Sequence, residues 1–101
     1  MKRPFRLRVP DAVVRLVRGL HPELKRKVRS SLNRLESEPD AGKALQAELE
    51  GLRSLRAGRF RIIYRVAGRR VIEIVAVGPR DRIYEETLRL LSTETIEGKR
   101  R

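Results

Sequence analysis

The chain has 101 residues, of which 25 are Lys or Arg and 13 are Asp or Glu, so its formal net charge is +12. This length accommodates one compact domain, and a content of 40% hydrophobic residues predicts a folded core. The absence of cysteine excludes a disulfide framework, a thiolate zinc site and a cysteine nucleophile. A single histidine cannot build a metal site, so we expect neither a metal nor a cofactor.

The apolar runs are only a few residues long, whereas a membrane span needs about 20. The N-terminus leads into no apolar signal segment, so we expect a cytoplasmic protein with no membrane partner. The large excess of positive charge attracts polyanions, which makes a nucleic acid or an acidic protein the expected partner. A solvated basic surface without such a partner is the alternative.

The first part of the chain predicts one strand and two helices. Residues 5–9 alternate between apolar and charged side chains, which is the period of a half-buried strand. Pro10 ends this pattern, and from Asp11 to the turn at Gly19 the apolar residues recur at helical spacing. In residues 23–38, Leu and Val recur every three or four positions and basic residues fill the other positions. We expect the two helices to form a hairpin.

The second part predicts three strands and a last helix. Residues 43–50 are expected to form a weakly helical connection. Strands are expected at residues 52–57, 60–66 and 71–77. An amphipathic stretch over residues 81–91 predicts a helix, and residues 92–101 predict a flexible basic tail. The element order predicts one α+β domain over residues 1–91, with a small antiparallel-rich sheet packed against the N-terminal helix hairpin.

The strands on either side of Gly58 can be aligned residue by residue. A two-residue turn with Gly58 in its first position pairs Arg56 with Arg61. Because side chains alternate along a strand, one face of this pair is the expected core face. That core face carries Leu55, Ala57, Phe60, Ile62 and Tyr64. The opposite face carries Ser54, Arg56, Arg61, Ile63 and Arg65.

A three-residue turn at residues 68–70 extends this alignment to the last strand. It places Glu73 opposite Arg65, where the two side chains can form an ion pair. It also predicts that three apolar residues of the last strand join the core face. These residues are Ile72, Ile74 and Ala76.

The pairing of Arg56 with Arg61 places two like charges opposite each other. Such a pair destabilises the strand pair by roughly 0.2–1 kcal/mol. A phosphate that bridges the two guanidinium groups would offset this cost, because its oxygens match their forked donors. The alternative is that both side chains turn into water or reach a carboxylate. The carboxylates in question are Glu48, Glu50 and Glu73.

Two segments carry a resemblance to a known family. They are GLRSLRAGRFRIIYRV at residues 51–66 and VGPRDRIY at residues 77–84. They resemble the RelE/ParE superfamily of type II toxins, in which a G-L-R-S-L-R-x-G-x-[YF]-R-[IV]-[IV]-Y pattern precedes a V-G-x-R-x-x-[IV]-Y segment. The resemblance covers almost the whole chain. It implies a fold like that of microbial ribonucleases and a cognate antitoxin as partner.

The superfamily contains two activities, so its fold does not decide the function. RelE-like members enter the ribosomal A site, among ribosomal RNA, and cut mRNA, whereas ParE-like members poison DNA gyrase. The net charge favours the first activity, because a protein that contacts RNA phosphates releases counterions. The resemblance then implies a metal-independent endoribonuclease that inhibits translation, in which the RNA 2′-hydroxyl attacks the adjacent phosphate. A gyrase inhibitor and a catalytically inactive antitoxin-binding protein are the alternatives.

The resemblance also assigns a catalytic site, which consists of Arg56, Arg61, Arg80 and Tyr84. The arginines would stabilise charge on the phosphate, and the tyrosine would stack on a base or orient the substrate. Ser54 stands where the family has a basic residue, and Pro79 where many relatives have His. Since arginine keeps its proton, Glu48 or Glu50 is the candidate general base, unless alignment of the 2′-hydroxyl suffices. The candidate RNA-binding residues are Arg53, Arg65, Arg82, Lys25, Arg26 and Arg29.

Overall fold

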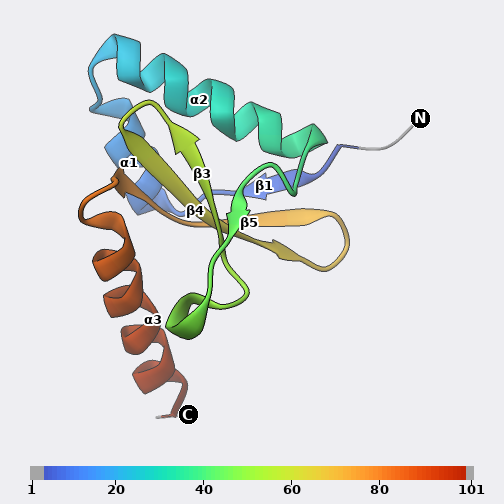
Figure 1. Cartoon of the computed structure of the whole chain (residues 1–101), viewed down its shortest axis with the longest axis vertical. Coiled ribbons are helices and arrows are strands. Elements are labelled where there is room, and N and C mark those ends of the chain that lie inside the picture. The colour runs from blue at the N-terminus through green and yellow to red at the C-terminus, as the bar shows by residue number, and fades with distance from the viewer. Residues whose placement is uncertain (1–3, 100–101) are drawn as a thin grey trace.

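The structure, a computed structural model, describes the backbone of residues 4–99 and the side chains of residues 4–92. The elements are β1 (Arg6–Arg8), α1 (Asp11–Arg18), α2 (Pro22–Ser37), β2 (Lys43–Ala44), the 3-10 helix η1 (Ala47–Leu49), β3 (Arg53–Ala57), β4 (Phe60–Ala67), β5 (Val71–Pro79) and α3 (Ile83–Lys99). Figure 1 shows α1 and α2 on one face of the sheet and α3 on the other. The expected α+β fold is therefore confirmed.

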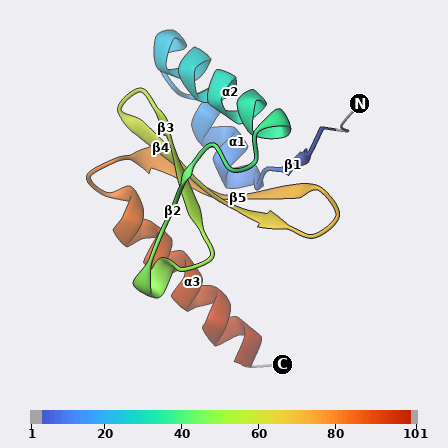
Figure 2. The ribbon, with the colours of Figure 1, turned by 45° about the vertical axis from the view of Figure 1, so that its right-hand side comes forward.

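The five strands form one sheet in the order β1-β5-β4-β3-β2. β1 runs parallel to β5, and the other neighbours are antiparallel. In the turned view of Figure 2, α2 and α3 again lie on opposite sides of this sheet. The antiparallel-rich sheet and the helix hairpin on one face agree with the sequence.

The first core lies between the sheet and the α1–α2 hairpin. Val13 and Val17 enter it from α1, and Val28 and Leu35 from α2. The strands contribute Leu55, Ala57, Ile62, Tyr64, Ile72, Ile74 and Val77. This confirms the core face expected for β3 and β4. The predicted two-residue turn is also confirmed, since Arg56 pairs with Arg61 across the two strands.

A second core lies on the opposite face, beneath α3. It consists of Leu52, Ile63, Ala76 and Ile83, with Leu91 of α3 packed against it. The sequence assigned Ile63 to the face that carries the arginines, and this is correct. The packing of α3 nevertheless buries Ile63 completely, so the part of this face beneath α3 is apolar and covered.

Ala76 belongs to this second core, so its expected place beside Ile72 and Ile74 is wrong. Ile63 pairs with Ala76 but Tyr64 pairs with Ile74, which leaves Val75 as an extra residue. Such a β-bulge reverses the alternation of side chains along the strand. The three-residue turn and the pairing of Arg65 with Glu73 lie before the bulge, and both are confirmed.

Two segment boundaries also differ from the expectation. Residues 43–44 form β2 instead of a weak helix, because they pair with the edge of β3. Gly42 permits this close approach, since a Cβ at this position would lie 2.7 Å from the Tyr64 hydroxyl.

Helix α3 continues to Lys99, past the expected end at residue 91, and residues 100–101 of the expected tail lie outside the described part. No described helix is long and apolar enough to cross a bilayer.

Candidate active site

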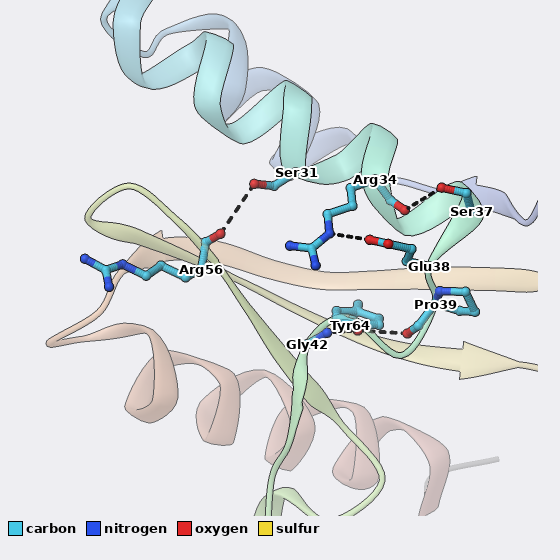
Figure 3. Close-up of polar contacts among 8 residues, drawn as sticks. All are labelled: Ser31, Arg34, Ser37, Glu38, Pro39, Gly42, Arg56 and Tyr64. Atoms are coloured by element: carbon cyan, nitrogen blue, oxygen red, sulfur yellow. Dashed lines mark hydrogen bonds and ion pairs between the residues drawn. The ribbon is translucent and has the colours of Figure 1, made fainter.

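The adjacent strands β3, β4 and β5 bring the candidate arginines to one end of the α3 face. Arg56 pairs with Arg61, which pairs in turn with Gly78. Arg56 is exposed and turns away from its neighbour, because its Nε donates to the carbonyl of Gly58 at 3.3 Å. Figure 3 shows its guanidinium pointing away from α2. Among the side chains of residues 4–92, neither arginine takes part in an ion pair.

Tyr84 enters this end of the sheet from the first turn of α3. Its hydroxyl oxygen lies 3.2 Å from the Oγ of Ser54. Ser54 is only 3% exposed, and the other buried polar side chain that the structure describes, Thr87, donates to the carbonyl of Ile83 in its own helix. A buried hydroxyl needs a hydrogen-bond partner. Ser54 therefore holds the phenol of Tyr84 beside the arginine end of the sheet.

One shallow depression brings Arg80 and Tyr84 together. It is lined by Arg59, Pro79, Arg80, Asp81 and Tyr84. The backbone N–H of Arg80 donates to the carbonyl of Arg59 at 3.3 Å, which ties the end of β5 to the β3–β4 turn. Gly78 lets α3 pack closely here, because a Cβ at this position would lie 3.0 Å from Cδ1 of Ile83.

Arg59 and Asp81 are two residues of this depression that sequence reasoning did not select. Arg59 occupies the β3–β4 turn, and the end of β5 lies against this turn because Phe60 pairs with Pro79. Only the position of Arg59 in the turn could have indicated it, since a tight turn in an antiparallel sheet lies beside the end of the neighbouring strand. Asp81 is adjacent to Arg80 in the chain, and no pattern distinguished it from a surface charge.

The candidate bases Glu48 and Glu50 lie away from the arginines. Both are exposed and precede β3, whereas Arg56 is near its far end. The strand rises about 13 Å between Leu52 and Arg56, at about 3.3 Å per residue. The structure therefore does not bring the two glutamates to the depression. Among the described side chains, no group of three His, Asp or Glu residues could hold a metal ion.

Two candidate RNA-binding arginines interact with other parts of the protein. Arg53 donates to the carbonyl of Gly42 at 3.0 Å and to that of Asp40 at 3.2 Å, so it holds the loop before β2. Arg65 forms an ion pair with Glu73, which also pairs with Arg8. The hydrogen bond from Arg65 lowers the pKa of Glu73, against the opposing effect of partial burial. RNA contact by Arg53 and Arg65 stays a prediction.

The remaining candidate RNA-binding residues are exposed or line a separate depression. Arg82 is exposed in the turn between β5 and α3, next to the depression of Tyr84. Three α2 residues, Lys25, Arg26 and Arg29, line a depression on the outer side of that helix. Because α2 and α3 cover opposite faces of the sheet (Figure 1), these cations do not face Tyr84 directly.

Tyr64, the other tyrosine of the chain, has a structural role. It is completely buried, and its hydroxyl accepts from the N–H of Gly42 at 2.8 Å and donates to the carbonyl of Pro39 at 2.8 Å. Figure 3 shows this contact below the ion pair of Arg34 with Glu38 at the end of α2. Tyr64 therefore stabilises the loop that leads from α2 to β2.

An apolar groove lies between α1, β5 and α3 and has a volume of about 600 Å³. The residues that line it include Val9, Val13, Leu16, Ile74 and Leu90. Leu16 is 40% exposed and Leu90 is 47% exposed. Large apolar side chains that remain exposed around a groove mark an interaction surface.

Comparison with known proteins places this fold and site in a family. Residues 8–84 match the family described as ParE toxin of the type II toxin-antitoxin system parDE. The RelBE2 toxin-antitoxin complex from Mycobacterium tuberculosis is similar, with 30% identity and a TM-score of 0.66 over 76% of this chain and 99% of that chain. The archaeal RelE–RelB complex from Pyrococcus horikoshii has 28% identity and a TM-score of 0.64 over 78% of this chain and 98% of that chain.

A variant of the Escherichia coli toxin RelE in the free state shares the fold, with 18% identity and a TM-score of 0.65 over 85% of this chain and 96% of that chain. No curated protein sequence matches the chain. The family match spans most of the chain and includes every residue that lines the depression of Arg80 and Tyr84. The chain therefore belongs to the RelE/ParE superfamily of toxins from type II toxin-antitoxin systems.

Proposed function

We propose that this toxin is a metal-independent endoribonuclease that cleaves mRNA on the ribosome and so inhibits translation in the cytoplasm. The observation that carries the proposal is the grouping of Arg56, Arg61, Arg80 and Tyr84 at one end of the sheet. Guanidinium groups without carboxylate partners are suited to binding a phosphate and to stabilising the charge that develops on it. The net charge of +12 suits a protein that works among RNA phosphates.

In the proposed reaction, the ribose 2′-oxygen attacks the adjacent phosphorus and the bond from phosphorus to the 5′-oxygen breaks. The products are a 2′,3′-cyclic phosphate and a 5′-hydroxyl. The 2′-hydroxyl gives its proton to a base, and the leaving 5′-oxygen takes up a proton. Arg61 and Arg80 stabilise the charge on the phosphate oxygens, with Arg56 beside them. Tyr84, held by Ser54, orients the substrate.

Asp81 is the carboxylate that lines the depression together with Arg80 and Tyr84, so we propose it as the general base in place of Glu48 and Glu50. Replacing Asp81 by Asn should lower the cleavage rate while RNA binding stays unchanged or becomes tighter, because one negative charge is lost. The matched control is Glu50→Gln, which removes an exposed carboxylate that precedes β3. Equal cleavage rates in both variants would remove Asp81 from the mechanism.

Expression without antitoxin tests the nuclease proposal. We expect translation to stop and mRNA to be cut at ribosome-occupied codons. Arg61→Ala and Tyr84→Phe should relieve the arrest while circular dichroism shows a folded protein. Arg18→Ala, which removes an exposed arginine of α1, should leave the arrest intact. Intact mRNA during the arrest would overturn the proposal.

Gyrase inhibition is the second candidate function, because the matching family is that of ParE toxins. It predicts intact mRNA, blocked replication and double-strand DNA breaks, together with inhibition of supercoiling by purified gyrase. A catalytically inactive antitoxin-binding protein predicts neither phenotype but retains the partner. These outcomes separate all three functions in one set of strains.

We also propose a cognate antitoxin as the protein partner, since the solved relatives include a RelBE2 complex and a RelE–RelB complex. The apolar groove between α1 and α3 is the surface that we assign to it. An amphipathic, acidic segment would cover Leu16 and Leu90 and offset the basic charge of the toxin. Leu90→Asp should weaken antitoxin binding in a pull-down, whereas Val66→Asp, an equally exposed apolar residue outside the groove, should not.

A further inference from the structure

Lys27 and Arg56 meet at the β3–β4 turn from opposite sides. A Cβ built on Gly58 would lie 3.1 Å from Cδ of Lys27 and 4.0 Å from its Nζ, so the ammonium group lies over the turn. From the other side, Nε of Arg56 donates to the carbonyl of Gly58 at 3.3 Å. Together with Arg59 these residues line one depression. We call Lys27, Arg56, Gly58 and Arg59 the turn notch.

The turn notch holds three cations and is flanked by one carboxylate, Glu23, with His21 and Leu24 completing the lining. Within residues 4–92, none of the three cations makes an ion pair. Three cations beside a single carboxylate leave an excess of positive charge, and a bound anion relieves the repulsion among the cations. The turn notch therefore has the charge of an anion site.

The packing of α2 on the sheet builds the turn notch. Ser31 of α2 donates to the backbone carbonyl of Arg56 at 3.4 Å (Figure 3), which fixes the helix against β3. Gly58 provides the space above the turn and has a φ of 63°, which glycine adopts without strain. The positions of Lys27 and Arg56 thus follow from helix–sheet packing.

The turn notch lies between the candidate active site and the cations of α2. Arg59 also lines the depression that contains Arg80 and Tyr84. On the other side, Lys27 and Arg56 line a depression that includes Arg26 of α2. Shared residues therefore connect three depressions in a row, from Tyr84 across the β3–β4 turn to the surface of α2.

We propose that the turn notch binds a backbone phosphate of single-stranded RNA, next to the phosphate attacked in the active site. The inference rests on the proposed function, because it takes RNA as the substrate. Arginine supplies a fork of donors and lysine a compact charge, and both suit a phosphate. RNA is favoured over an acidic peptide because the row of depressions contains none of the large exposed apolar residues that would anchor a peptide.

The test is the salt dependence of RNA binding by the whole chain. The probe is a short fluorescent single-stranded RNA with 2′-O-methyl groups, which cannot be cleaved, titrated between about 50 and 200 mM salt. The double variant Lys27→Gln/Arg59→Gln leaves Arg56 in place. The matched control is Lys43→Gln/Arg69→Gln, which also removes one exposed lysine and one exposed arginine, but outside the turn notch.

Each lost phosphate contact should reduce the slope of log affinity against log salt by about 0.7. Because the turn notch binds one phosphate, we expect a reduction of up to about 0.7 for the turn-notch variant and little change for the control. Equal slopes in the two variants overturn the inference. A turn-notch variant that keeps its RNA affinity but loses binding to an acidic antitoxin also overturns it and assigns the surface to that partner.

Ribosome-dependent mRNA cleavage by the unaltered protein separates this result from the fate of the proposed function. If mRNA is cleaved and the two double variants have equal slopes, the nuclease function stands and the turn notch fails. If no mRNA is cleaved but the slope falls only in the turn-notch variant, the phosphate site stands and the nuclease function fails.

Discussion

Replacing Tyr64 by Phe should destabilise the fold more than any other removal of a single hydroxyl oxygen from the described side chains. The hydroxyl satisfies the buried N–H of Gly42 and the half-buried carbonyl of Pro39, each at 2.8 Å. A buried donor without a partner costs about 1–3 kcal/mol, and the carbonyl can be hydrated in part. We therefore expect the free energy of unfolding to fall by about 2–3 kcal/mol. In a domain of this size the corresponding fall in Tm is about 10–20 °C.

Tyr84→Phe is the matched control, because it removes the same atom from the other tyrosine of the chain. Tyr84 is half-buried and its hydroxyl has one partner, the buried Ser54, at 3.2 Å, so the cost should be about 1–2 kcal/mol, below that of Tyr64→Phe, which leaves two groups unpaired. Denaturant unfolding measures both values, and hydrogen exchange at the Gly42 amide reports the loop directly. A loss for Tyr64→Phe no larger than that for Tyr84→Phe would refute the reasoning. Cleavage activity should show the reverse order.

Two further substitutions test the electrostatics and the backbone. Glu73→Gln removes ion pairs with Arg65 and Arg8 and should cost about 1 kcal/mol at pH 7, since these pairs are partly exposed. Because pairing lowers the pKa of Glu73, this contribution is complete above its ordinary value of about 4.5 and is lost as the pH falls through the lowered pKa. A difference from the unaltered protein that persists at pH 2 would contradict this assignment. Arg69 has a φ of 62° in an exposed turn, so Arg69→Gly should raise the free energy of unfolding by about 0.5–1 kcal/mol. An unchanged or lower denaturation midpoint would show that the turn is not strained.

The strand pairing near the β3–β4 turn was predictable because the turn is short and carries its own signal. Gly58 in the first position determines the pairing of Arg56 with Arg61, and alternation then assigns each side chain to a face. The bulge in β5 was not predictable, because Val75, Ala76 and Val77 are all apolar and show no alternation. β2 was missed for a different reason, since its pairing depends on the space that Gly42 leaves beside Tyr64.

Family resemblance and strand register selected Arg61, Arg80 and Tyr84, and the structure places them at one end of the sheet. The resemblance and the register could not show what each side chain contacts. Arg53 and Arg56 are three positions apart along β3, so the alternation of side chains puts them on opposite faces. Arg53 consequently holds the loop before β2, whereas Arg56 reaches the β3–β4 turn. Such distinctions depend on tertiary neighbours.

The bulge at Val75 determines which face of the sheet the following side chains of β5 occupy. Before it, Ile72 and Ile74 face α2, whereas after it Ala76 and Gly78 face α3. A regular strand in which Val75 paired with Ile63 would instead turn Gly78 toward α2 and place Val77 on the face of Ile83. The geometry of the site therefore depends on the exclusion of one residue from the strand pairing more than on the identity of that residue. Substitutions at Val75 should be tolerated, and its deletion should leave Gly78 on the α3 face, because Ala76 and Val77 would keep Ile63 and Ile62 as partners.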